Sequence, residues 1–280
     1  MSDVLTSLNA LAALPGVAEQ TAAAREACTR LRWHEALRRR IPEAAAESRV
    51  RGAQASAALE GANLPVDVVR DLMRGARSWP EQLDPVEQVA KGVVLATAET
   101  EHIGPMVLTA PLQALARLHT AAAAPLTEPA RLGRPRQAGE ECAEFVDLGP
   151  APEPEAAHER LAGVVEVLLA GQGVPTVVVA AVVHAEIAHA RPFARANGAV
   201  ARALERAVLK ATGLDPTGVV VPEAGHGAQG GPAYLGALAA YGTGSPEGVA
   251  LWLGHCSQAI VAGAEEGLRI CDAVRAGRLG

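Results

Sequence analysis

The spacing of apolar residues along the chain predicts a succession of helices. In most segments apolar side chains recur three and four residues apart, which places them on one face of an α-helix. Proline near the start and glycine near the end of several segments agree with helix boundaries. Helices are predicted in the ranges 16–40, 43–60, 65–75, 85–98, 105–122, 155–169, 177–190 and 197–209. The predicted fold class is therefore all-α.

Two segments depart from this simple pattern. The range 129–154 is rich in proline and glycine, and its short apolar piece Phe145–Val146 predicts a small β-hairpin within 134–148. The stretch that starts at Val177 is β-branched at first, so a buried strand is also compatible with it. Its length favours a buried helix.

Composition and charge narrow the function classes. Aromatic residues are only 2% of the chain, so a core of Ala, Leu and Val must pack closely. The formal net charge of −6 gives no electrostatic support for binding to nucleic acid or to an anionic membrane. The four cysteines form no CxxC pair, which argues against a zinc knuckle or a disulfide framework. No apolar run reaches the length of a membrane span, and we expect a cytoplasmic protein.

Two apparent motifs are better explained without a ligand. The run Gly225–Gly230 matches GxGxxG, but it does not directly follow a strand in a βαβ unit, so we expect an ordinary flexible loop there. His184, Glu186 and His189 suggest a metalloprotease, yet the two histidines are five residues apart rather than four. On an ideal helix they lie roughly 140° apart and cannot share one zinc ion. The sequence therefore predicts no metal site.

The most informative segment lies between the predicted helices 177–190 and 197–209. A proline-initiated turn at Pro192 leads to Asn197–Gly198, which opens the second helix. A glycine-containing turn at a helix N-terminus directs backbone N–H groups outward and can form an anion site. From the residues alone, a helix–loop–helix that serves only packing is the simpler interpretation.

This segment resembles the signature of the Fic (Fido) family, HPFx(D/E)GNGRxxR. An upstream histidine that the family often carries falls on His184. The matching signature residues are Pro192, Phe193, Asn197, Gly198 and Arg202. Four signature positions differ. The family's catalytic histidine falls on Arg191, its metal-binding acid on Arg195, its first loop glycine on Ala196 and its first phosphate-binding arginine on Ala199.

A second resemblance lies upstream, in Ser56–Gly61, which is similar to the family's inhibitory motif (S/T)xxxE(G/N). In that family the glutamate of this motif reaches the second arginine of the loop and blocks the γ-phosphate of ATP. The resemblance therefore implies that Glu60 contacts Arg202. It also implies an inhibitory set made of Ser56, Glu60 and Gly61.

The resemblance further implies how the chain is organised. The expected parts of one compact unit are N-terminal helices in 1–85 with an inhibitory-type helix around 43–60, a Fic-like core in 86–212, and C-terminal helices in 213–280 packed on that core. Arg134, Arg136 and Phe145 fall where the family has its target-binding hairpin, the flap.

The altered loop changes the expected chemistry. In the family the loop histidine deprotonates a target hydroxyl, which then attacks the α-phosphate of a Mg²⁺-bound nucleotide. Arg191 is always protonated and cannot act as a general base. A cation at Arg195 would repel Mg²⁺ where the family has a metal ligand. No catalytic residue is therefore assigned, and Arg191 only marks the position of the family's base.

A loop with more positive charge can still bind an anion. The expected anion- or nucleotide-binding residues are Arg191, Arg195, Ala196, Asn197, Gly198 and Arg202. The first hypothesis is thus a pseudoenzyme that binds ATP, another nucleotide, another phosphate-containing small molecule or a protein partner, without needing Mg²⁺. A homodimer is compatible with this hypothesis.

Two alternatives remain open. One is an active nucleotidyl- or phosphotransferase with non-standard catalytic residues, such as His184 or His189 as the base. The other is a structural helical protein whose motif matches arise by chance.

Overall fold

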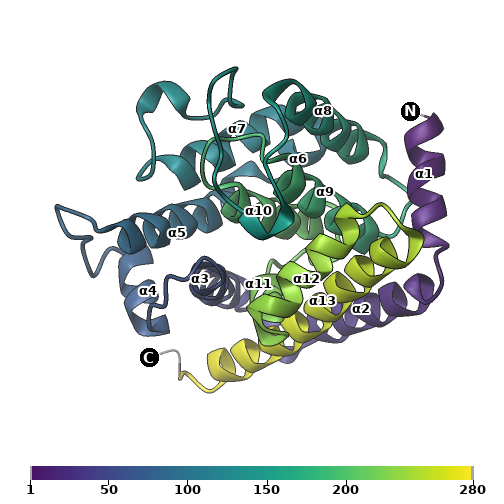
Figure 1. Cartoon of the computed structure of the whole chain (residues 1–280). Coiled ribbons are helices and arrows are strands. Elements are labelled where there is room, and N and C mark those ends of the chain that lie inside the picture. Colours follow the sequence, from purple (N-terminus) through teal and green to yellow (C-terminus); the bar gives the residue numbers. More distant parts are fainter. Residues whose placement is uncertain (1, 279–280) are drawn as a thin grey trace.

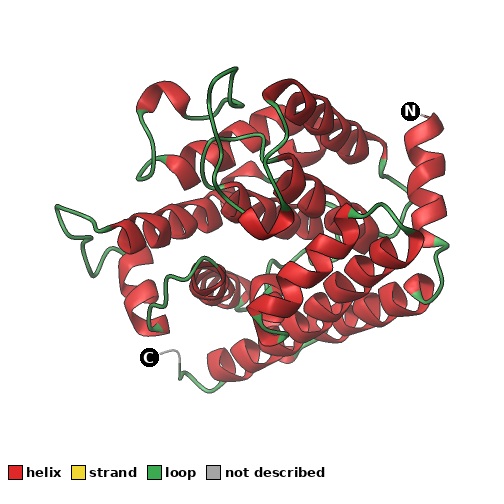
Figure 2. Cartoon of the chain, in the orientation of Figure 1, coloured by secondary structure: helices red, strands yellow, loops and turns green. Residues whose placement is uncertain are grey.

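The fold of the chain was determined as a computed structural model that describes residues 2–278 (Figure 1). The first half contains α1 (Ser2–Ala12), α2 (Val17–Arg32), η1 (Glu35–Arg38), α3 (Ile41–Leu59), α4 (Val66–Met73), α5 (Pro85–Ile103), α6 (Met106–Thr109) and α7 (Pro111–Ala123). The second half contains η2 (Pro129–Arg131), η3 (Val146–Leu148), α8 (Pro154–Ala170), α9 (Thr176–Ala190), α10 (Asn197–Ala211), α11 (Pro222–Ala228), α12 (Gly231–Gly242) and α13 (Pro246–Arg275). Within residues 2–278 there is no strand, as Figure 2 shows, so the chain is all-helical.

Helices α9 and α10 form the centre of the molecule (Figure 1). They pack on each other, and almost every residue of both is buried. On one side, α8 covers α9 while α5 and α7 cover α10. On the other side, the long α13 packs against α2, α11 and α12. The loop that joins α9 to α10 is therefore held between two well-packed helices.

Small residues bring the helices of the C-terminal part close together, as the scarcity of aromatic side chains led us to expect. A Cβ atom on Gly263 of α13 would approach the carbonyl oxygen of Val221 to 2.6 Å. A Cβ atom on Gly225 of α11 would overlap the backbone of Ala259. Trp252 is a large side chain in this region, and its indole donates a 2.8 Å hydrogen bond to the carbonyl of Ala181 in α9. Here α11 and α13 meet backbone to backbone.

One hydrophobic cluster extends through the chain, from Leu8 in α1 to Val274 in α13. The N-terminal, central and C-terminal parts of the chain all contribute to it, for example through Leu31, Leu204 and Trp252. Among the described residues, none of the helices combines the length and the apolar character that a membrane crossing requires.

The β-hairpin predicted within 134–148 is wrong. This segment is irregular apart from η3, and arginine side chains bind its carbonyl groups where a strand ladder would otherwise form. The flexible loop expected at Gly225–Gly230 is also wrong, because residues 222–228 form the short helix α11. The helix predicted over 16–40 ends at Arg32 and is followed by the separate turn η1.

Candidate functional site

The loop between α9 and α10 has an unusual backbone. Arg191 ends α9 in the left-handed region with φ 45°, and Ala196 precedes α10 with φ 67°. Residues with a Cβ rarely adopt this conformation, at a cost of roughly 1 kcal/mol each. A glycine falls at the position of Ala196 in the Fic signature, and the positive φ explains why a glycine suits that position. The loop shape is thus kept although the residue differs.

Asn197 holds the loop closed. Its side-chain oxygen accepts a 3.0 Å hydrogen bond from the amide of Phe193, and its side-chain nitrogen donates a 2.8 Å hydrogen bond to the carbonyl of Phe193. The ring of Phe193 is buried and stacks on the imidazole of His119 with the ring centroids 4.0 Å apart. These contacts fix the direction of the backbone N–H groups at the start of α10.

Arg191 does not face the start of α10. Its guanidinium, in a residue only 2% exposed, donates hydrogen bonds of 2.8 to 3.3 Å to four carbonyl groups of the segment 144–150. Those carbonyls belong to Glu144, Phe145, Gly149 and Pro150. The side chain at the position of the family's base therefore fastens the irregular 134–153 segment, which we call the flap, to the loop.

Arg136 makes a second attachment of the flap. Its backbone amide donates a 2.8 Å hydrogen bond to the carbonyl of Pro192. Its side chain donates to the carbonyl of Arg191 at 2.7 Å and to the carbonyl of Pro152. The prolines of this segment have no backbone N–H to donate. Arg136 and Arg191 supply donors to the flap carbonyls instead.

A carboxylate occupies the N-terminus of α10. One oxygen of Glu144 accepts a 2.5 Å hydrogen bond from the amide of Ala196. The other accepts 2.8 Å hydrogen bonds from the backbone amide and the side-chain nitrogen of Asn197. Burial, and then the nearby charge of Glu60, raise the pKa of Glu144, while these hydrogen bonds oppose the rise. The backbone donors at the start of α10 are therefore occupied by an acidic side chain from the flap.

The second arginine of the signature lies beneath this site and is 1% exposed. Arg202 forms an ion pair with Glu60 and donates a 2.8 Å hydrogen bond to the hydroxyl of Ser56. It also lies 3.4 Å from the hydroxyl of Tyr234. Burial alone would lower the pKa of Arg202, but the Glu60 carboxylate and Tyr234 raise it above its ordinary value. Arg202 is thus a permanent, paired cation.

The structure brings together most of the residues that the sequence singled out. Glu60 lies at the end of α3 and reaches across to α10, as the resemblance implied. A Cβ atom on Gly198 would overlap the Glu60 carboxylate, so glycine is needed for this approach. Gly61, with φ 83°, turns the chain directly after the inhibitory-type helix. Arg195 lies exposed on the loop, outside this set of contacts.

His184 and His189 both lie on α9 and bind different partners. Both ring nitrogens of His184 are bound, Nδ1 to Glu205 at 2.6 Å and Nε2 to the hydroxyl of Tyr234 at 2.8 Å. The Nε2 atom of His189 bonds to the carbonyl of Leu238 at 2.8 Å. His184, Glu205 and His226 are the described residues whose atoms lie close enough to hold a metal ion. The sequence argued against a site shared by His184 and His189, and it did not indicate Glu205 or His226 as neighbours of His184.

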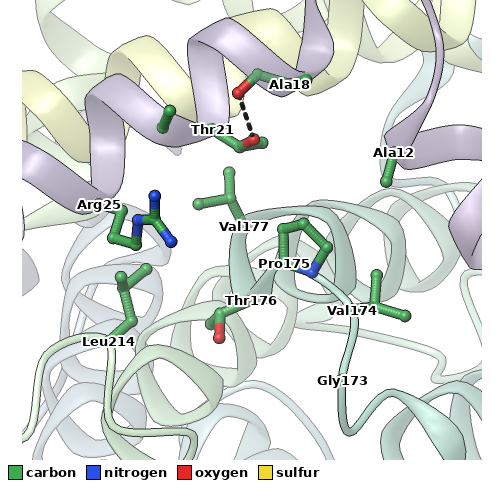
Figure 3. Close-up of a pocket in the computed structure, with 11 residues that line it drawn as sticks. Ala12, Ala18, Thr21, Arg25, Gly173, Val174, Pro175, Thr176, Val177 and Leu214 are labelled. Carbon is green, nitrogen blue, oxygen red and sulfur yellow. Dashed lines mark hydrogen bonds between the residues drawn. The ribbon is translucent and has the colours of Figure 1, made fainter.

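An open cavity lies elsewhere, between α2 and the start of α9 (Figure 3). It has a volume of about 500 Å³, and the side chain of Arg25 lies close to Val177 and Leu214 in its lining. The residues of the α9–α10 loop do not line it. At the start of α10, by contrast, the Glu144 side chain of the flap occupies the backbone donors.

Glu144 was missed by sequence reasoning. It lies in the irregular flap, 52 residues before Ala196, where no periodic pattern indicates which side chain faces the core. Glu140, Glu141 and Asp147 lie close by in the sequence, so nothing marked Glu144 as the acid that faces the loop.

Comparison with known proteins supports the fold. No family sequence model matches the chain, and no curated protein matches it by sequence. Among solved structures, a Fic family protein from Desulfovibrio desulfuricans is similar at a TM-score of 0.68 and 19% identity, over 91% of this chain and 74% of that one.

Two further structures show the same similarity. Fic-1 from C. elegans matches at a TM-score of 0.64 and 17% identity, over 93% of this chain and 73% of that one. A Fic domain containing signaling protein from Bacteroides thetaiotaomicron matches at a TM-score of 0.60 and 14% identity, over 91% of this chain and 98% of that one. The chain therefore has the Fic fold.

Proposed function

We propose that this protein is a Fic-fold pseudoenzyme that binds a phosphate-bearing ligand at the N-terminus of α10 and does not transfer a nucleotide. The observation that carries the proposal is the Glu144 carboxylate on the amides of Ala196 and Asn197. A carboxylate and a phosphate oxygen require the same donors, and a helix N-terminus attracts both. Glu144 therefore marks where a phosphate group would bind.

The geometry around Arg191 supports the absence of nucleotidyl transfer. A general base must be unprotonated and within hydrogen-bond reach of the substrate hydroxyl. The guanidinium of Arg191 is charged, buried and directed at flap carbonyls. His184 and His189 do not take its place, because the ring nitrogens of His184 are bound to Glu205 and Tyr234 and the Nε2 atom of His189 is bound to the carbonyl of Leu238. The alternative of a transferase with a different base thus has no support from these two residues.

The charges support a ligand that binds without a metal. The family's metal-binding acid is replaced by Arg195, which lies exposed at the edge of the loop. A phosphate that displaced Glu144 would meet backbone N–H groups, with Arg202 beneath and Arg195 at the side. Mg²⁺ would add a further cation to a site that already carries positive charge. We therefore expect binding of pyrophosphate, ATP or a related ligand to be independent of Mg²⁺.

Two acidic side chains keep the site closed at rest. Glu144 fills the backbone donors and Glu60 neutralises Arg202. A ligand must displace at least Glu144. Only the molecules in which the Glu144 carboxylate has left the backbone donors can bind the ligand, so the apparent affinity is lower than the intrinsic affinity. The proposed pseudoenzyme is thus a binding protein in which the Glu144 side chain competes with the ligand for the same backbone donors.

Calorimetric titration with pyrophosphate and with ATP, each with and without Mg²⁺, tests this proposal. Glu144→Gln removes the charge and leaves one acceptor where two are needed, so we expect the affinity for both ligands to rise by about tenfold or more. Glu141→Gln is the matched control, because Glu141 is an exposed acid of the same flap. Equal affinities in all three proteins, or covalent transfer of a label from ATP, would refute the proposal.

A further inference from the structure

Behind the anion site, three ligand-type side chains from three helices converge in the core. His184 of α9, Glu205 of α10 and His226 of α11 are each 0% exposed. The Nδ1 atom of His184 lies 2.6 Å and the Nε2 atom of His226 lies 2.9 Å from the same oxygen of Glu205. Each residue offers one nitrogen or oxygen atom that could bind a metal ion, and these three atoms lie within 4.8 Å of one another.

Imidazole nitrogens and carboxylate oxygens are ordinary ligands of divalent transition metals, and they bind in the neutral and the ionised form respectively.

Each histidine also has a partner on its other ring nitrogen. The Nε2 atom of His184 lies 2.8 Å from the hydroxyl of Tyr234, and the Nδ1 atom of His226 lies 3.0 Å from Nε2 of His255. Histidine ligands commonly donate their second N–H to a partner that fixes the ring. A hydroxyl oxygen and a neutral imidazole nitrogen can both accept such a bond. Tyr234 and His255 therefore complete the surroundings of a metal site.

One oxygen in this cluster has no partner. Oε1 of Glu205 is buried and makes no hydrogen bond with any described residue. A buried, unpaired carboxylate oxygen is costly, since the group loses its hydration without replacement. Coordination to a cation would satisfy it. This orphaned oxygen is independent of the two histidine contacts, and it also points to a missing ligand.

We propose that His184, Glu205 and His226 bind a Zn²⁺ ion or a similar divalent transition metal. Two nitrogens and a carboxylate suit zinc, whereas Mg²⁺ and Ca²⁺ prefer oxygen ligands alone. The metal displaces the N–H protons at Nδ1 of His184 and Nε2 of His226, and each proton moves to the other ring nitrogen. The three side chains are fully buried, so the ion would be enclosed in the core. It would fasten α9, α10 and α11 together directly behind the anion-binding loop.

Because the site is enclosed, the metal must enter during folding. The test uses the full chain without an affinity tag, unfolded in guanidinium with a chelator, freed of chelator and refolded with or without Zn²⁺. Metal content is measured by mass spectrometry after gel filtration. We expect one zinc ion per chain and a higher melting temperature with zinc, since a ligand of the folded state stabilises it.

Matched variants locate the ion. His226→Gln should abolish stoichiometric zinc binding, and His255→Gln should weaken it by about 10- to 100-fold, as expected for a partner of a ligand. His189→Gln should retain full binding, because His189 is also a buried histidine of α9 but bonds to a backbone carbonyl. Zinc content that is unchanged in His226→Gln would overturn the proposal.

A spectroscopic test does not depend on the folding of variants. Cobalt(II) bound to the wild-type chain by His184, Glu205 and His226 should give visible d–d absorption without a thiolate charge-transfer band. A thiolate band would place the ion on cysteine instead and contradict the proposed ligands. A wild-type chain that refolds fully and takes up neither zinc nor cobalt would show that the cluster is only a hydrogen-bond network.

Discussion

Asn197 donates two hydrogen bonds of 2.8 Å to a single carboxylate oxygen of Glu144, one from its backbone amide and one from its side chain. The same side chain also closes the loop through Phe193. The residue that shapes the anion site therefore also binds the acid that fills it.

Restoring the family's base should not restore transfer. Arg191→His supplies an imidazole, but the acid position still holds Arg195 and the first arginine position still holds Ala199. The variant should also lose stability by about 1–3 kcal/mol, because four flap carbonyls lose their donor. Chemical denaturation and transfer of label from ATP check both expectations. Arg195→His, at an exposed loop position, is the control and should change stability little.

Much of the fold was predictable from the sequence because it rests on local signals. Periodic apolar residues, with Pro85 at the start of one segment, predicted most of the helices, although the helix predicted over 85–98 continues to Ile103 and the one predicted over 105–122 is divided at Ala110. The flap was not predictable in the same way. Its conformation depends on Arg136 within the segment and on Arg191 outside it, whose side chains bind its carbonyls across 16 and 42 residues of sequence, and neither local propensity nor period reports such contacts.

The site was predictable only where a sequence motif links its parts. The pair Glu60 and Arg202 was expected from two motifs, and the structure places the two side chains in contact, although their inhibitory role stays a prediction. The buried acid Glu205 carries no such motif. Its signal is physical: a charged residue within the buried helix α10 needs partners, and those partners come from α9 and α11.

Breaking the Glu60–Arg202 pair should move stability and affinity in opposite directions. Glu60→Ala leaves the buried Arg202 cation without its carboxylate, which should cost about 2 kcal/mol of unfolding free energy. The freed cation should in turn bind pyrophosphate more tightly. Glu43→Ala is the control, since it removes a surface ion pair with Arg40 and should cost less than about 1 kcal/mol. Unchanged stability and affinity in Glu60→Ala would contradict this account of the pair.

A methyl group added at Gly198 should also break the Glu60–Arg202 ion pair. Gly198→Ala places a Cβ atom where the Glu60 carboxylate now lies, so Glu60 must leave Arg202. We expect a loss of stability comparable to that of Glu60→Ala, and little further loss when the two changes are combined. Gly163→Ala, on open helix surface in α8, should instead stabilise the protein by about 0.5–1 kcal/mol. Double-mutant denaturation curves test the predicted coupling.

His119 should make stability depend on pH. Burial lowers its pKa from 6.5 to about 4, and its Nε2 atom has no hydrogen-bond partner among the described residues. Between pH 4 and pH 6.5 the unfolded chain therefore binds a proton at this histidine that the folded chain does not bind. The free energy of unfolding consequently falls as the pH drops from 6.5 to 4. His119→Gln should reduce the slope of unfolding free energy against pH by about 1.4 kcal/mol per unit in this window. An unchanged slope would show that His119 does not titrate as its burial requires.

The most direct test of the central claim is an NMR titration of the Glu144→Gln protein with pyrophosphate in the absence of Mg²⁺. If the start of α10 is an anion site that Glu144 normally fills, the backbone amides of Ala196 and Asn197 and the side-chain amide of Asn197 should shift progressively and saturate. The same signals in the wild-type protein should respond only at higher pyrophosphate concentrations. Saturable shifts confined to other parts of the chain, or none at all, would contradict the account.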